Sequence, residues 1–316
     1  MKRSRLANLD YSMLSSYMGR WTTVVAFTAM VLLALGAIFL KSDDLAHVPV
    51  VIGVSAFDSI RAAPALESLA DFCRGKGCGD VRWRYLRAGD EPSGCDFYLM
   101  TSLELSPALG RGTLGCALIV SEAEARRYSA GAVVVRAGTR QLPPGGGRII
   151  FSSPLSAAGF LSPYRALVKA GYAIPQRDGA VDFAGLVRGD ERVVLGVLYG
   201  AYDAGGVSEE RLRGLEASGC VRPGEIDVLL KGEAYPEVVL ASDRAIDSPE
   251  QRGFTRRFPG VLKSVPPLLR GELTRLGIAE LHHPRPDDID LIKKLSTMVP
   301  PPLEYHRPSG SPRASR

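Results

Sequence analysis

Histidine and cysteine are scarce in this chain of 316 residues, which has four histidines and five cysteines. The cysteines form no Cys-x-x-Cys pair and have no Cys/His spacing suited to zinc. The adjacent residues His282 and His283 have no partners at metal-ligand spacing, which is typical of a surface turn. We therefore expect no metal site and no metal cofactor.

The familiar catalytic and nucleotide-binding motifs are missing as well. The sequence has no Gly-x-Ser-x-Gly elbow, no P-loop and no His-Glu-x-x-His. Residues 110–115 match Gly-x-Gly-x-x-Gly, but a strand-like apolar run at 116–120 follows them where a dinucleotide site requires a helix. We expect neither an enzyme nor a bound organic cofactor.

The net charge of +5 and the pI near 9.0 do not predict a nucleic-acid partner. Part of the basic excess lies at the two ends of the chain, and between the ends the charges are mixed. Binding to a phosphate backbone requires basic residues gathered on one surface, and the sequence gives little support for that.

Residues 21–40 form an uncharged apolar run of 20 residues. At a rise of about 1.5 Å per residue, a helix of this length spans a hydrocarbon core of roughly 30 Å. Four basic residues precede the run, whereas Lys41 is followed by Asp43 and Asp44, so the positive-inside rule places the N-terminus in the cytoplasm. We expect a single-pass anchor in the cytoplasmic membrane, with residues 1–20 as a cytoplasmic basic arm.

The main domain is then periplasmic or extracellular. A cleaved signal peptide is the alternative, although no small-x-small cleavage site follows the apolar run. In an oxidising compartment cysteines can cross-link, and Cys73 and Cys78 flank a short Gly-containing turn. We consider a disulfide between these two residues, with two buried reduced thiols as the alternative.

From residue 48 the apolar patterns alternate between strand and helix, which predicts an α/β fold with mixed, mostly parallel sheets. A Pro- and Gly-rich stretch at 141–147 suggests a change of lobe, and residues 300–316 are typical of a disordered tail. The expected strands cover 48–55, 81–86, 95–101, 116–120, 132–136, 149–151, a short stretch around 203, 226–230 and 237–241. The expected helices cover 57–72, 155–168, 191–198, 207–215, 260–276 and 287–298.

Residues 148–168 have the pattern of strand, tight loop and helix. Ser152, Ser153 or Ser156 can cap the helix, whose unpaired N–H groups and positive dipole end then face the region above the strand. Such a helix start is suited to bind an anion. The alternative is that these serines are helix caps with no ligand.

Three segments resemble a known family. Residues 151–163 are similar to its Asp-Pro-x-Ser-Thr-Ser-Gly-[Phe/Tyr]-Leu-x-Pro element, and residues 189–207 look like its Gly-His-Glu segment followed by Val-x-x-Gly-x-[Val/Tyr]-Asp-Ala-Gly. Residues 128–136 resemble its strand that crosses between lobes. Over 48–298 the chain therefore resembles the phosphate/phosphonate substrate-binding proteins of ABC transporters, a branch of the type II periplasmic binding proteins.

The resemblance implies two lobes around a ligand cleft, with lobe 1 at 45–140 and about 225–299 and lobe 2 at 141–224. The serine helix start is suited to an anion, whereas the acidic residues Glu191 and Asp203 are suited to an ammonium group, so the combination fits a zwitterion. The expected ligand-binding residues are Ser55, Thr101, Ser152, Ser153, Ser156, Ala157, Ala158, Gly159, Glu191 and Asp203.

The chain departs from the family pattern at the helix start. Ala157 and Ala158 stand where the family has hydroxyl groups, and Asp190 stands at its histidine position. Our leading hypothesis is a membrane-anchored extracytoplasmic solute-binding protein for a small anionic or zwitterionic ligand, serving ABC-type uptake with a permease partner. The alternative is a sensor or scaffold in an envelope complex that has kept the fold and lost high-affinity binding.

Overall fold

The computed structural model describes residues 49–56, 59–86, 94–123, 126–145, 147–174, 180–185, 188–243 and 248–300. Within these ranges, no helix has the length and apolar character needed to cross a membrane. The expected membrane helix at 21–40 and the basic arm before it lie outside the described residues, as does the tail from residue 301.

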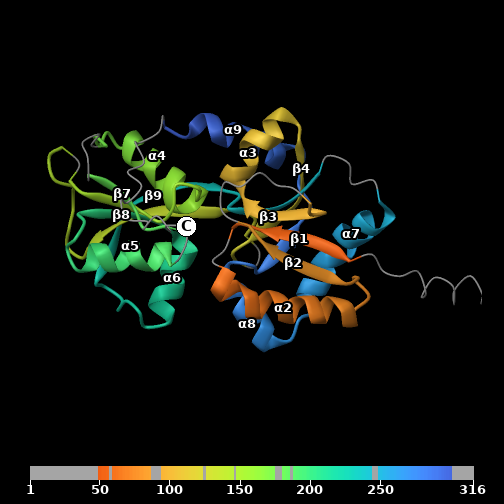
Figure 1. Ribbon diagram of the computed structural model, residues 1–316. Helices are drawn as coiled ribbons and strands as arrows, with labels where there is room; N and C mark the ends of the chain where they lie inside the picture. Colours follow the sequence, from red (N-terminus) through yellow and green to blue (C-terminus); the bar gives the residue numbers. More distant parts are fainter. Residues whose placement is uncertain are drawn as a thin grey trace, which may run out of the picture. The chain divides into compact units, whose positions relative to one another are not determined.

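The described chain forms an α/β fold with two sheets (Figure 1). We call the first sheet and its helices lobe 1. Its strands lie in the order β11-β4-β10-β3-β1-β2. They are β1 (Val50–Val54), β2 (Val81–Tyr85), β3 (Phe97–Thr101), β4 (Leu114–Ser121), β10 (Val238–Asp243) and β11 (Glu280–His282). The helices are α2 (Ser59–Gly75), α3 (Ser102–Arg111), α7 (Pro249–Lys263), α8 (Pro267–Leu276) and α9 (Pro286–Met298).

Both faces of the first sheet are buried at its central strands β3 and β10. Successive side chains along a strand point to opposite faces, so each face packs against its own set of helices. In β3, Leu99 packs into a cluster with residues of α2, α7 and α8. Its neighbours Tyr98 and Met100 pack with residues of α3 and α9. The apolar runs without polar alternation in β3 and β10 therefore reflect helices on both sides of the sheet.

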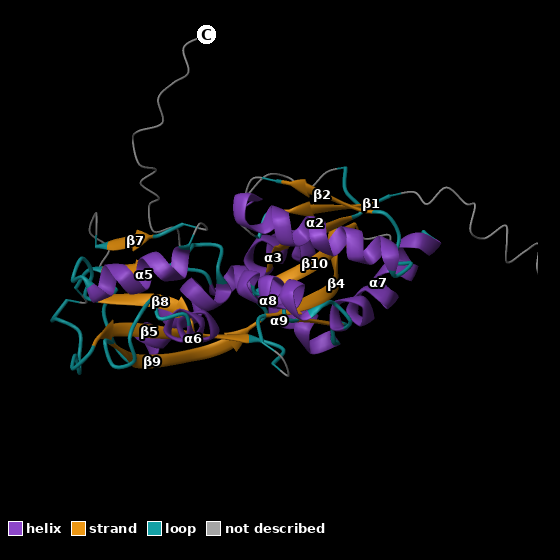
Figure 2. Ribbon diagram, turned by 90° about the horizontal axis from the view of Figure 1, so that it is seen from below, coloured by secondary structure: helices purple, strands orange, loops and turns teal. Residues whose placement is uncertain are grey.

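The second sheet and its helices form lobe 2. Its strands lie in the order β7-β6-β8-β5-β9, and Figure 2 shows β5, β8 and β9 side by side. They are β5 (Ser129–Arg136), β6 (Ile149–Phe151), β7 (Val181–Phe183), β8 (Ala204–Ser208) and β9 (Ile226–Tyr235). The helices are the π-helix η1 (Ala157–Leu161), α4 (Ser162–Lys169), α5 (Gly189–Leu198) and α6 (Glu209–Ala217).

The expectation of mostly parallel sheets is wrong for the described strands. The pairs β1–β2, β1–β3, β6–β7 and β6–β8 are parallel. The pairs β3–β10, β4–β10, β4–β11, β5–β8 and β5–β9 are antiparallel. For the two pairs that involve β10, the reason is that this strand returns from lobe 2 and inserts between β3 and β4 without a crossover helix, which parallel pairing would require.

Strands β5 and β9 belong to the second sheet, although both lie in the ranges expected for lobe 1. The five-stranded sheet therefore runs from Ser129 to Tyr235 and is wider than 141–224. Strand β5 pairs with β8 on one side and with β9 on the other, so its apolar residues are buried within lobe 2. The chain passes between the lobes after β4 and again between β9 and β10.

Several local predictions can be compared with the structure. Residues 110–115 end helix α3 and begin β4, and Gly112 has the left-handed φ of 72° that is common at a helix end, so the rejection of a dinucleotide motif is confirmed. His282 lies in the short strand β11 and not in a turn. Cys73 and Cys78 are buried free thiols, and the hydrogen bond between them raises the pKa of Cys73, as its burial does.

Gly131 in β5 lets η1 and α4 lie against the second sheet. A Cβ atom at this position would be 2.2 Å from the carbonyl oxygen of Ala158 and 2.6 Å from Pro163 Cδ. By contrast, a Cβ atom at Gly214 in α6 would meet no atom within 4 Å. The close approach of the η1 backbone to β5 thus requires a residue without a side chain at position 131.

We expect Gly131→Ala to lower the free energy of unfolding by about 1–3 kcal/mol, because the added methyl group overpacks the contact with η1. The matched control Gly214→Ala should raise it by roughly 0.5–1 kcal/mol, since alanine favours a helix interior. Urea denaturation of both variants measures the difference. Equal effects of the two substitutions would contradict this packing.

Candidate ligand-binding site

A cleft of about 680 Å³ is lined by residues of both lobes. This volume is typical of sites for small molecules. Several lining residues lie where strands end: Thr101 ends β3, Ser152 follows β6 and Ser208 ends β8. These carboxyl ends of strands are where α/β folds commonly bind ligands.

The helix start after β6 forms part of this cleft. Ser156 is the N-cap residue, and its hydroxyl oxygen accepts a hydrogen bond from the N–H of Gly159 at 2.7 Å. The same hydroxyl donates to Glu237 Oε1 at 2.7 Å, and the N–H of Ala158 donates to Glu237 Oε2 at 2.6 Å. The carboxyl group of Glu237 therefore occupies the helix start.

Glu237 lies between β9 and β10 and is 9% exposed. Its burial raises the pKa of the carboxyl group to about 8, with repulsion from Glu122 and Asp190 acting in the same direction. The hydrogen bonds from Ser156 and Ala158 oppose this rise. Burial also raises the pKa of Asp190 to about 6. Two acidic groups of the cleft are thus held in environments that disfavour their negative charge.

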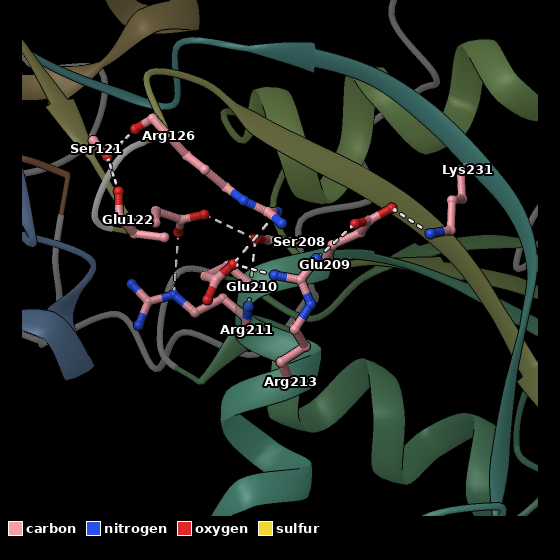
Figure 3. A network of polar contacts seen from close by, with 10 residues as sticks. Ser121, Glu122, Arg126, Ser208, Glu209, Glu210, Arg211, Arg213 and Lys231 are labelled. Carbon is pink, nitrogen blue, oxygen red and sulfur yellow. Dashed lines mark hydrogen bonds and ion pairs between the residues drawn. The ribbon is translucent and has the colours of Figure 1, made fainter.

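Glu122 belongs to a polar network beside these two acids (Figure 3). Its Oε2 accepts a hydrogen bond from the Ser208 hydroxyl at 2.8 Å, and its Oε1 lies 3.2 Å from Arg211 Nε. The N–H of Ser208 donates to Asp190 Oδ1 at 3.0 Å. Ser208 therefore links the carboxylates of Glu122 and Asp190.

Arg211 connects the two lobes. It lies on α6 of lobe 2 and donates to the carbonyl oxygens of Arg275 and Leu276 at the end of α8 in lobe 1, at 2.7 Å for Leu276. Gly277 leaves room for this contact, because a Cβ atom there would be 2.5 Å from Arg211 Nη2. Carbonyl groups at a helix C-terminus carry partial negative charge and favour a cation.

The cleft lining contains five acidic and five basic side chains. Three ion pairs account for six of them: Arg211 with Glu122 at 3.2 Å, Arg188 with Glu191 at 3.4 Å and Arg213 with Glu210 at 2.5 Å. The four that form no ion pair with another described residue are Asp190, Glu237, Arg61 and Arg275. The cleft therefore offers a ligand acidic and basic groups that have no ion-pair partner among the described residues.

Five of the ten residues expected to bind ligand line this cleft. Thr101, Ser152, Ser153, Ser156 and Glu191 line it, and the two serines that follow β6 are each 4% exposed. Ala157, Ala158 and Gly159 form the buried first turn behind Ser156. Glu191 is paired with Arg188.

Ser55 and Asp203 are not among the residues that line the cleft. The hydroxyl of Ser55 donates to Glu104 Oε2 at 3.2 Å, and Ala56 lines the cleft in its place. Asp203 precedes β8, so it lies at the opposite end of this strand from Ser208. Its carboxylate accepts the N–H of Arg148 at 2.7 Å and closes the turn before the strand.

Several charged and polar groups of the cleft were not predicted from the sequence. Asp190 was noted only as a replacement for the family's histidine. Ser208 had a usable signal, because a polar residue at the end of an apolar strand often faces a site. Glu122 and Glu237 had no local signal, since each lies on a segment between the lobes, and only the tertiary fold brings them together. These missed residues are Glu122, Ser208, Arg211 and Glu237, with Arg61 and Arg275 at the rim.

Comparison with known proteins agrees with this architecture. The family described as "ABC transporter, phosphonate, periplasmic substrate-binding protein" matches residues 109–282, which is more than half of the chain. The chain therefore belongs to this family of solute-binding proteins. No curated protein sequence matches it.

Solved structures share the fold at low sequence identity. A Xanthomonas citri protein bound to ATP is 16% identical with a TM-score of 0.60, covering 79% of this chain and 96% of its own. A binding-protein component of an ABC phosphonate transporter from Pseudomonas aeruginosa is 17% identical (TM-score 0.58; 77% and 83% covered). The PhnD1 protein of Prochlorococcus marinus in complex with methylphosphonate is 13% identical (TM-score 0.58; 79% and 96% covered).

The raised pKa of Glu237 predicts a pH-dependent stability. The folded chain keeps a proton on this carboxyl up to about pH 8, whereas the unfolded chain loses it near the ordinary value of 4.5. The proton on Glu237 therefore stabilises the folded chain fully below the unfolded pKa of 4.5, and this stabilisation is lost as the pH rises through the folded pKa of about 8.

We expect the free energy of unfolding to fall between about pH 5 and pH 8, by at most about 1.4 kcal/mol per pH unit for this one proton. Glu237→Gln should flatten the decline, whereas Glu272→Gln, at an exposed position of α8, should leave it unchanged. Urea unfolding across this pH range measures the slope. An identical slope in the wild type and in Glu237→Gln would show that Glu237 does not cause it.

Proposed function

We propose that this chain is a membrane-anchored, extracytoplasmic solute-binding protein for a small zwitterionic ligand and that it serves ABC-type uptake. One observation carries the choice of ligand. Two acidic side chains, Asp190 and Glu237, and two basic ones, Arg61 and Arg275, line the same cleft without an ion pair to a described residue. A ligand with one charge of each sign complements such a lining.

The positive group of the ligand binds beside Asp190 and Glu237. A cation there offsets the repulsion between these carboxyl groups and Glu122, which now raises the pKa of Glu237. The negative group binds beside Arg61, which lies in the first turns of α2 in lobe 1. Hydroxyl groups of Ser152, Ser153 and Thr101 supply further hydrogen bonds.

Family membership supports the transport role. The similar protein of Pseudomonas aeruginosa is a binding-protein component of an ABC phosphonate transporter. The similar protein of Prochlorococcus marinus was solved in complex with methylphosphonate. An aminoalkylphosphonate combines such an anion with an ammonium group and is one zwitterion of the required kind. A permease in the membrane is the partner that this role requires.

The cross-lobe contacts of Arg211 favour a second candidate function. They hold α6 to the end of α8 through groups of the protein itself. A lobe arrangement kept by the protein's own side chains suits a sensor or scaffold of an envelope complex. This function predicts a stable envelope partner in a cross-linked pull-down and no small ligand.

Calorimetry of the full chain in detergent tests the leading proposal. We expect at least one compound from a panel of aminoalkylphosphonates and amino acids to bind more tightly than phosphate does. Asp190→Asn and Arg61→Ala should each weaken that binding at least tenfold, because one charge-assisted hydrogen bond contributes about 1.5–3 kcal/mol. Arg256→Ala, an exposed position on α7, is the control and should have no effect. Absence of millimolar binding across the panel would contradict the proposal.

The membrane anchor has its own test. We expect the full chain to remain in the membrane fraction after carbonate extraction, and a chain without residues 1–44 to be released as a soluble protein. Alkaline phosphatase fused after residue 300 should be active, because that enzyme requires an oxidising compartment. An inactive fusion, or release of the full chain by carbonate, would contradict the anchored topology.

A further inference from the structure

Glu237 is attached to lobe 1 through its backbone and to lobe 2 through its side chain. The N–H of Ser102 donates to the carbonyl oxygen of Glu237 at 2.9 Å, and the Ser102 hydroxyl donates to the carbonyl oxygen of Pro236 at 2.5 Å. These bonds fix the segment between β9 and β10 against α3. The side chain of Glu237 extends from that fixed segment to the start of η1.

The carboxyl group engages the donors at the start of η1. The Ser156 hydroxyl donates to one oxygen and the Ala158 N–H to the other, at 2.7 and 2.6 Å. The Gly159 N–H is engaged by Ser156 Oγ. An oxyanion from solution that bound at this helix start would need the two donors that Glu237 already holds.

Glu237 is more than a helix cap. The N-cap residue of η1 is Ser156 itself, whereas Glu237 comes from a segment 81 residues further along the chain. Its two oxygens accept hydrogen bonds from a hydroxyl and a backbone N–H, which are the donors that a helix start offers to a bound anion. Because it is covalently attached, it also competes without the entropy cost that a free anion has on binding.

We propose that the carboxyl group of Glu237 is an internal ligand that occupies the oxyanion position of this cleft and determines its specificity. The cleft therefore rejects phosphate and simple phosphonates at the helix start, and it selects ligands whose anionic group binds elsewhere. This inference rests on the proposed function as a solute-binding protein and specifies which subsite of the cleft is closed.

The test compares methylphosphonate, phosphate and acetate binding to the full chain and its variants in detergent by calorimetry. We expect Glu237→Ala to vacate the position and to bind at least one of these anions at least tenfold more tightly than the wild type. Glu237→Gln keeps the space filled with a neutral side chain of the same size, so its gain should stay below threefold. Adding Ser156→Ala to Glu237→Ala should cancel most of the gain, because it removes the vacated hydroxyl donor.

If Glu237→Ala binds none of these anions more tightly than the wild type does, the proposal is overturned. An equal gain in Glu237→Gln would also overturn it, because a side chain of the same size would then fail to exclude the anion. If Glu237→Ala does not fold without additives, its circular dichroism and thermal unfolding with 100 mM acetate or phosphate become the readout. Recovery of the folded state supports the proposal, and failure of every anion to restore it counts against it.

This outcome is independent of zwitterion binding by the wild type. A gain of anion binding in Glu237→Ala identifies Glu237 as the occupant even if no zwitterion binds the unaltered chain. Conversely, a wild-type chain that binds a zwitterion while Glu237→Ala gains no anion would leave the solute-binding role intact and refute the role of Glu237.

Discussion

The paired hydrogen bonds from Ser156 and Ala158 to Glu237 are the interaction on which the cleft depends. A carboxyl group buried without partners would cost on the order of several kcal/mol, so the helix start and the segment after β9 have to stay in register. Ser102 holds the same segment from the side of lobe 1. One residue therefore fixes both the geometry of the helix start and the connection between the lobes, and it does so with a group that is chemically similar to the ligands of the family.

Much of the local structure follows from the sequence. The run at 149–151 is a strand, and the serines after it lead into a helix, because an apolar stretch followed by N-cap residues is a short-range signal. Of the three serines that were candidates for the cap, the structure selects Ser156. The two-lobed family was also identified from local motifs, and the matched residues 109–282 confirm it.

The rest depends on contacts between distant segments. Strand β10 inserts antiparallel between β3 and β4, which no periodicity in residues 238–243 indicates, because antiparallel and parallel strands have the same alternation. Asp203 matched the spacing of a family motif, yet it precedes its strand and closes a turn. Glu237 and Ser156 are 81 residues apart, and their pairing depends on how the chain returns from lobe 2 to lobe 1.

The guanidinium group of Arg211 has a consequence for kinetics. It spans from Glu122 to the last carbonyl groups of α8, and these bonds form across the cleft from the protein's own atoms. A solute that enters by separation of the lobes has to wait until these bonds break. Its association rate then depends on how often the lobes part, because a required conformational change lowers the rate constant for association.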